Sequence, residues 1–380
     1  MQQNRSLYQF KWKLLIFFGL VLCLLTAFVQ FIPRIHYSYH PTWSPMDSKI
    51  AFVCYHLSPI QTYGLERPPY SGDIPYSPLH QEICVSDGKS IQIVTNNNFS
   101  DYYPRWSPDG AWLAFFSSRA SDPALYLMRP DGSEERELVQ ATYGSDIAWS
   151  PDGKTIALAT SWGGVRNDPS GIFLIDLQSG TQKQVWAGEV MGLAWSPDEE
   201  WIAFTARTDY HACNLYILST SNQSEAIGPI TAGCNSPPSW SADGNYLAFV
   251  METISQQTES GIGPRQRTLF LLNPMTLDIQ QLSSGSEWIE DIIWSPKEDI
   301  LFYIEGKRIM RLYLQGTPQP EEVFASDSLV VFYGGGNLTI SPDGQTLAFL
   351  LGGKGESEVW LKDMNSSQLT RLRSQCFLFC

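Results

Sequence analysis

Several motifs that carry well-known chemistry are missing from this chain of 380 residues. It has no Gly-x-Ser-x-Gly elbow, no P-loop, no dinucleotide-binding glycine motif and no Cys-x-x-Cys pair. These absences speak against a serine hydrolase, a nucleotide-binding enzyme and a zinc- or thioredoxin-type site. We therefore expect no cofactor, and the sequence identifies no catalytic residue.

Positive charge is also scarce, with 25 Lys and Arg against 39 Asp and Glu and a net charge of −14. The first 13 residues contain Arg5, Lys11 and Lys13 and no acid. The rest of the chain therefore carries a charge of about −17, which repels a phosphate backbone. We expect no nucleic-acid partner.

One long hydrophobic run is present, from Leu14 to Ile32. As a helix it would be about 28 Å long, close to the thickness of a bilayer's hydrocarbon core. The basic residues before it place the N-terminus in the cytoplasm and the rest of the chain outside. A cleaved signal peptide, cut near Thr26-Ala27, and a lipoprotein anchor at Cys23 are the alternatives.

The predicted domains follow from this run. We expect a cytoplasmic segment (1–13), a transmembrane signal anchor (14–32), a linker (33–40), one large domain (41–373) and a short tail (374–380). The protein is thus predicted to be a single-pass membrane protein with an extracytoplasmic domain.

A short motif recurs roughly every 45 residues through the large domain. Its clearest copy, residues 106–115, reads Trp-Ser-Pro-Asp-Gly-Ala-Trp-Leu-Ala-Phe. Pro, Asp and Gly favour a tight turn, and the flanking residues are β-prone, so each copy predicts a hairpin. Copies begin at Trp43, Trp106, Trp149, Trp195, Trp240, Trp294 and Ile340.

Two further strands follow each hairpin, as in residues 125–128 and 136–139. Four strands in a unit of about 45 residues are typical of a β-propeller blade. The fold class is therefore all-β, a seven-bladed propeller that closes without borrowing a strand from the N-terminus. We expect the motif tryptophans to pack between blades.

Repeats of this form resemble the TolB-type propeller repeats, which share their architecture with WD-repeat propellers. The resemblance covers residues 41 to about 373 and implies a bacterial source. TolB itself has six blades, so six blades are the alternative count. The resemblance is a strong signal for the fold and a weak one for function, for which we expect a binding scaffold more than an enzyme.

The strand order sorts the loops onto two faces of the ring. The Ser-Pro-Asp-Gly turns share one face, named face B, and the connections from second to third strand share the other, named face A. The long insertions, near residues 56–80, 161–170, 207–212 and 251–266, all belong to face A. Because loops on a rigid scaffold often carry function, face A is the predicted binding face.

Six cysteines lie outside the membrane segment, an even number that suits an oxidising compartment. Cys54 and Cys84 flank the first insertion, and Cys213 and Cys234 lie near face A, so we predict two disulfides, Cys54–Cys84 and Cys213–Cys234. Six reduced, buried thiols are the alternative.

The predicted function is recognition of a protein or peptide through face A, with a glycan as a possible ligand. Tyr, Trp and Arg dominate interface energetics, which selects most of the candidate contacts. They are Tyr63, Arg67, Tyr70, Tyr76, Trp162, Arg166, Asp209, His211 and Arg265. The alternative is a metal-assisted polysaccharide lyase or hydrolase, in which His56, His80 and His211 on face A would hold a divalent ion. We predict no metal site.

Overall fold

The computed structural model describes most of the chain between residues 38 and 372. The described stretches are 38–56, 80–119, 123–140, 144–160, 170–207, 213–221, 226–232, 237–254, 265–283, 288–315, 318–329, 337–353 and 356–372. Within them, no helix is long and apolar enough to cross a membrane. The predicted anchor at residues 14–32 lies outside these stretches.

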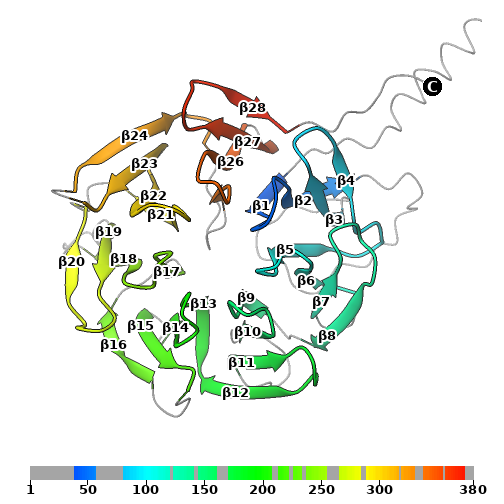
Figure 1. Ribbon diagram of the computed structural model, residues 1–380, viewed down its shortest axis with the longest axis horizontal. Coiled ribbons are helices and arrows are strands. Elements are labelled where there is room, and N and C mark those ends of the chain that lie inside the picture. The colour runs from blue at the N-terminus through cyan, green and yellow to red at the C-terminus, as the bar shows by residue number, and fades with distance from the viewer. Residues whose placement is uncertain are drawn as a thin grey trace, which may run out of the picture.

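The described residues form seven antiparallel sheets, each made of four strands that are consecutive in the sequence. Figure 1 shows the sheets as a ring of blades, with the first strand of each blade nearest the axis and the fourth at the rim. The predicted seven-bladed propeller is confirmed, and the six-bladed alternative is wrong.

The strands of blades 1 to 4 are the following. Blade 1 has β1 (Ser38–Trp43), β2 (Ile50–His56), β3 (His80–Ser86) and β4 (Ile91–Ile93); blade 2 has β5 (Asp101–Trp106), β6 (Leu113–Ser117), β7 (Ala124–Met128) and β8 (Arg136–Gln140); blade 3 has β9 (Gly144–Trp149), β10 (Thr155–Thr160), β11 (Gly171–Asp176) and β12 (Gln182–Ala187); blade 4 has β13 (Glu189–Trp195), β14 (Trp201–Arg207), β15 (Cys213–Ser219) and β16 (Ala226–Ala232). β1 thus begins at Ser38, inside the segment predicted as a linker.

Blades 5 to 7 complete the ring. Blade 5 has β17 (Ser239–Trp240), β18 (Leu247–Ile254), β19 (Arg265–Leu272) and β20 (Ile279–Gln281); blade 6 has β21 (Ile289–Trp294), β22 (Ile300–Glu305), β23 (Arg308–Tyr313) and β24 (Pro320–Ala325); blade 7 has β25 (Leu338–Ile340), β26 (Thr346–Gly353), β27 (Glu356–Asp363) and β28 (Leu369–Arg371).

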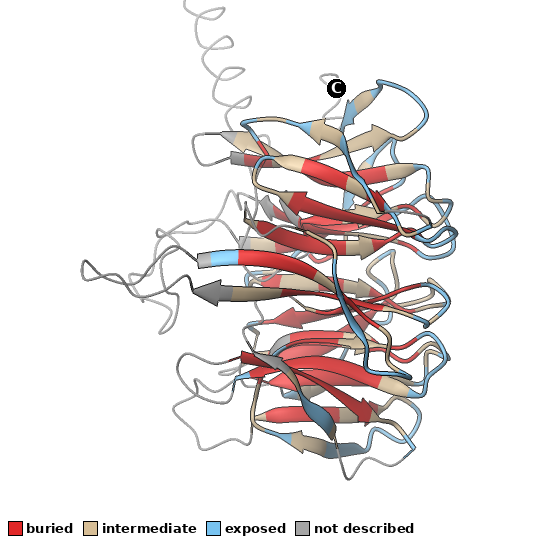
Figure 2. Ribbon diagram, turned by 90° about the vertical axis from the view of Figure 1, so that its left-hand side faces the viewer, coloured by how far each residue is buried: buried red, intermediate tan, exposed pale blue. Residues whose placement is uncertain are grey.

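The Ser-Pro-Asp-Gly turns are held by their own side chains. In blade 2, the Ser107 hydroxyl donates to Asp109 at 2.5 Å and accepts the backbone N–H of Trp112 at 2.9 Å. This hydrogen bond from Ser107 lowers the pKa of Asp109. Blades 3, 4, 5 and 7 repeat both bonds with Ser150, Ser196, Ser241 and Ser341. The motif therefore specifies a uniform turn, and Figure 2 shows exposed turns gathered along one side of the ring.

The hydrophobic core is divided into layers between neighbouring blades. Alternate residues of a second strand face opposite neighbours: Phe115 packs with blade 1 and Phe116 packs with blade 3. An equivalent apolar layer lies at each of the seven junctions, including the closing junction between blades 7 and 1. Among the described strands none is exchanged between the first and last blades, so side-chain packing closes the ring.

The motif tryptophans lie in these layers, as predicted. The indole N–H of Trp106 donates to the Thr42 carbonyl of blade 1 at 3.0 Å, and that of Trp294 donates to the Ser239 carbonyl of blade 5 at 2.9 Å. Trp149 and Trp240 make the same bond to the preceding blade. Each of these side chains thus joins two blades by packing and by a hydrogen bond.

Candidate binding face

Four blades carry their long connection between the second and third strands. These connections join β2 to β3, β10 to β11, β14 to β15 and β18 to β19. Because the second strands run from the Ser-Pro-Asp-Gly turns toward the opposite side, all four connections start and end on face A. The predicted sorting of the insertions onto one face is borne out by the strand order.

Most of the candidate contact residues lie outside the described stretches. These are Tyr63, Arg67, Tyr70, Tyr76, Trp162, Arg166, Asp209 and His211. Arg265 is described in its backbone and begins β19, opposite Ile254 of β18. The structure therefore places the strand ends that flank these insertions at face A. The contacts of the candidate residues themselves stay predictions.

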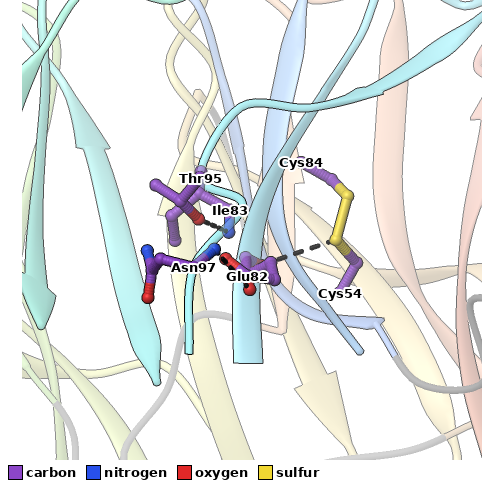
Figure 3. Close-up of a disulfide and its surroundings, with 6 residues drawn as sticks. All are labelled: Cys54, Glu82, Ile83, Cys84, Thr95 and Asn97. Atoms are coloured by element: carbon purple, nitrogen blue, oxygen red, sulfur yellow. Dashed lines mark hydrogen bonds between the residues drawn. A yellow bond between two sulfur atoms is a disulfide. The ribbon is translucent and has the colours of Figure 1, made fainter. Parts of the chain in front are cut away.

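A disulfide joins the two strands that flank the first insertion. Cys54 of β2 and Cys84 of β3 are both buried, and their Cα atoms lie 5.9 Å apart (Figure 3). This predicted disulfide is confirmed. Cys213, the first residue of β15, is also disulfide-bonded, whereas its predicted partner Cys234 lies outside the described stretches.

Beside this disulfide, two buried carboxylates approach each other at the junction of blades 1 and 2. The backbone N–H of Asn97 donates to Oε1 of Glu82 at 3.2 Å, and its side-chain amide donates to Oδ2 of Asp101 at 2.6 Å. The second oxygen of each carboxylate, Oε2 of Glu82 and Oδ1 of Asp101, is buried without a hydrogen-bond partner among the described residues. Figure 3 shows Glu82, Asn97 and the disulfide together at the lower end of β3.

One arginine compensates part of this negative charge. Arg119 forms ion pairs with Asp101, at 3.2 Å, and with Glu135, and lies 4.9 Å from the ring centre of Tyr126. Burial raises the pKa of Glu82 to about 8, with the nearby Asp101 charge adding to the rise. Burial also raises the pKa of Asp101, while Arg119 opposes that rise. Glu82 is therefore protonated at neutral pH, which removes one of two adjacent negative charges.

A second buried charge cluster lies at the junction of blades 5 and 6, also near face A. The Arg267 guanidinium pairs with Glu252 at 3.2 Å and with Glu290 at 2.5 Å, and all three side chains are at most 8% exposed. The guanidinium carbon lies 3.5 Å from the ring centre of Trp288, whose indole N–H donates to Glu290. Because Glu252 and Arg267 are cross-strand partners, this ion pair closes the base of the fourth insertion.

The innermost strands carry a third polar set that the sequence reasoning missed. Three residues before the motif position, Asp146 of blade 3 accepts the backbone N–H of Leu193 in blade 4 at 3.3 Å. At the same position, Asp291 of blade 6 accepts the backbone N–H of Asn337 in blade 7 at 3.1 Å. Burial raises the pKa of Asp146, against the opposing effect of Arg105. An alignment of the seven repeats could have revealed this set. The residue three positions before the start of the motif is polar in several copies, although the alternation of the strand predicts an apolar residue there.

A polar groove lies on face B, away from these clusters. Its volume is about 580 Å³, and it lies between blades 1 and 2. Lys49 and Arg129 provide positive charge in its lining, and Asp87, Asp131 and Glu134 provide negative charge. Its acids include turn residues such as Asp87, whose pKa is lowered mainly by the backbone N–H of Ser90. The groove is built from turn side chains that bond to their own backbone, so we do not place the binding site there.

No group of three or more metal-ligating side chains occurs among the residues described. His56 and His80 are backbone partners across β2 and β3, and His211 lies outside the described stretches. The proposed clustering of these three histidines stays a hypothesis.

The fold and the repeat turns define the class of protein as a β-propeller of the TolB type. The family model described as "TolB beta propeller domain" matches residues 76–315, and the chain belongs to this family. It is 34% identical over 148 residues to the uncharacterized peptidase YuxL of Bacillus subtilis, covering 38% of this chain and 21% of the relative. It is 36% identical over 83 residues to the Tol-Pal system protein TolB of Desulfosudis oleivorans, covering 21% of this chain and 18% of the relative. The chain thus spans about a fifth of the length of these curated relatives.

Solved structures share the fold at low sequence identity. An oligogalacturonate lyase in complex with manganese matches with a TM-score of 0.62 at 13% identity, covering 87% of this chain and 90% of the lyase chain. The β-propeller domain of the Trilobed protease from Pyrococcus furiosus matches with a TM-score of 0.59 at 10% identity, covering 92% and 100%. At these identities the likeness shows the fold alone.

Proposed function

We propose that this protein is a membrane-anchored, extracytoplasmic propeller that binds a protein or peptide partner through face A. The observation that carries the proposal is the placement of all four insertions on one face of a rigid ring. The base of the first insertion is held by the Cys54–Cys84 disulfide, and that of the fourth by the Arg267–Glu252 ion pair. Loops held at their bases lose less conformational freedom on binding, which favours affinity.

The composition of the insertions suits a protein partner. The first one supplies Tyr63, Arg67, Tyr70 and Tyr76, and the second supplies Trp162 and Arg166. Large aromatic and guanidinium groups contribute most of the binding energy in protein interfaces. The acidic domain makes a partner with basic surface loops the best complement.

The anchor is the other half of the proposal. Residues 14–32 would hold the propeller at the extracytoplasmic surface of the membrane, with residues 1–13 in the cytoplasm. Membrane fractionation tests this part: the full chain should remain in the pellet after alkaline carbonate extraction, and a chain that begins at residue 34 should not.

The face assignment is tested with a double variant, Tyr70→Ala with Trp162→Ala, in affinity recovery of partners from native membranes. We expect recovery to be lost while thermal stability is unchanged. Tyr313→Ala is the matched control, because Tyr313 is an exposed aromatic residue (42%) at the face B end of β23. Loss of recovery in the control, or undiminished recovery in the double variant, would contradict the assignment.

Metal analysis separates this proposal from the enzyme alternative. A stoichiometric divalent ion that is lost in His56→Ala and His80→Ala variants would favour a metal-assisted polysaccharide lyase or hydrolase on this scaffold. We expect the purified protein to bind no such ion.

A further inference from the structure

The direction of the first strand decides which face of the ring lies nearest to the N-terminal segment. In the β1–β2 pair, Trp43 is opposite Ile50 beside the face B turn, and Ser38 is opposite Cys54 at the other end. β1 therefore starts on face A, at the edge from which the insertions leave. The chain enters the propeller through its proposed binding face.

The connection from the hydrophobic run to this strand is short. Ile32 is its last residue and Ser38 is the first residue of β1. Six residue steps span at most about 22 Å, whatever conformation they adopt. Face B is farther away by the length of a strand, roughly 20 Å.

Resting on the anchor in the proposed function, we infer that face A is turned toward the membrane and that its partner is the outer surface of a membrane-embedded protein. A free globular domain is about 30 Å across, more than the gap that the connection allows. The part of a membrane-embedded protein that extends out of the bilayer already lies between the membrane and face A, so it can contact face A without having to enter this space from the side.

The lipid surface itself is a poor occupant for this face. Binding to anionic headgroups needs basic residues that are free to pair with phosphate. Four arginines whose side chains the structure describes near face A instead form ion pairs within the propeller: Arg119 with Asp101, Arg207 with Glu189, Arg267 with Glu290 and Arg308 with Glu305. The charge of about −17 beyond the first 13 residues adds repulsion.

Energy transfer in vesicles tests the orientation with the full-length chain. An azide-bearing amino acid is placed at Asn98, an exposed residue of the face A connection between β4 and β5, or at Met275, an exposed residue (79%) of the face B turn between β19 and β20. Each site is coupled to a donor dye, and the acceptor is a headgroup-labelled lipid. We expect higher transfer from position 98 than from position 275.

Tether length provides the matched control. A flexible Gly/Ser insertion of 30 residues after Pro33 has a root-mean-square reach of roughly 30 Å and should abolish the difference between the two positions. Equal transfer from both positions in the original chain, or higher transfer from 275, would overturn the orientation. Failure of the full-length chain to remain with vesicles would instead overturn the anchor, so the two failures are distinguishable.

Photocrosslinking in native membranes tests the partner class. A photoreactive amino acid replaces Asn98 or Met275, and a protease site is placed between Pro33 and Ser38 so that the propeller can be released after crosslinking. We expect a protein-sized adduct at position 98 that stays in carbonate-washed membranes after release, and none at 275. A released adduct, an adduct without a protein-sized shift, or no adduct at 98 would overturn the membrane-embedded partner.

Discussion

Blades 1 and 5 both carry an insertion between their second and third strands, and they hold its base in different ways. Blade 1 uses the Cys54–Cys84 disulfide, and blade 5 uses the Arg267–Glu252 ion pair. The disulfide is covalent but lies beside Glu82 and Asp101, each with a buried oxygen that lacks a partner among the described residues. The ion pair is not covalent, yet its guanidinium contacts two carboxylates and an aromatic ring. The comparison shows that the base of an insertion can be held either by a covalent link or by an ion pair, and the two should respond differently to mutation.

The largest expected effect is the loss of Arg267. Arg267→Met leaves Glu252 and Glu290 buried without their positive partner, which should cost about 3–5 kcal/mol of unfolding free energy. Arg119→Met, at the junction of blades 1 and 2, is the comparison variant. It should cost less, because Glu135 is partly exposed to water and the buried Asp101 keeps the hydrogen bond from Asn97. Urea denaturation followed by tryptophan fluorescence measures both, and equal losses would contradict the difference between the two bases.

The next largest effect is removal of the disulfide. Cys54→Ala with Cys84→Ala frees two residues that are 30 positions apart, and the loop-closure model gives a loss of about 3–4 kcal/mol. The control compares both proteins in reducing buffer, where they should be equally stable, because the disulfide of Cys213 is then open in both. A variant as stable as the oxidised protein would show that packing alone holds this base.

A pH effect is expected from Glu82, beside the disulfide. The pKa of Glu82 is about 8 in the folded protein against an ordinary 4.5, so the folded state keeps a proton that the unfolded state releases. The resulting stability is fully present below about pH 4.5 and is lost as pH rises through 8, with a slope approaching about 1.4 kcal/mol per pH unit.

Glu82→Gln should flatten this part of the stability profile, because the amide resembles the protonated acid and does not titrate. Thermal unfolding across pH 4 to 9 provides the measurement. Parallel profiles for the variant and the original protein would show that the Glu82 carboxyl does not keep its proton.

The smallest effect concerns the tryptophans that join the blades. Trp106→Phe and Trp294→Phe each remove one interblade hydrogen bond, and each should cost roughly 1 kcal/mol beyond the packing change. The indole nitrogen of Trp43 is buried without a partner among the described residues, so Trp43→Phe should cost less than either. Similar losses of unfolding free energy at positions 106 and 294 would show that the interblade hydrogen bond contributes equally at both junctions. A larger loss at position 43 would contradict the assignment of these losses to the hydrogen bond.

The repeat allowed most of the fold to be predicted. Turn residues such as Ser107 and Asp109 act within a few positions, so their role follows from local sequence. The Cys54–Cys84 disulfide was also predictable, because both cysteines flank one insertion. The transmembrane helix at residues 14–32 stays a prediction from hydropathy, because these residues lie outside the described stretches.

The charge clusters could not be predicted in the same way. Arg267 and Glu290 are separated by an entire strand and a blade connection, and only the packing of blade 5 against blade 6 brings them together. Arg265 was selected instead, because it is an arginine within the fourth insertion and arginines dominate interface energetics. The alternation of residues along one strand predicts toward which side of the sheet a side chain points. It does not predict which charged side chain of the neighbouring blade will contact it.

The strand order of the sheets bears on how such a ring can change over generations. Each blade is made of four consecutive strands, and within the described part of the chain the first and last blades share no strand. Duplication or deletion of about 45 codons therefore adds or removes a complete blade without orphaning a strand. A lineage with this closure can vary its blade number by simple recombination, because ring closure requires compatible apolar surfaces on the two terminal blades and no matching half-sheet.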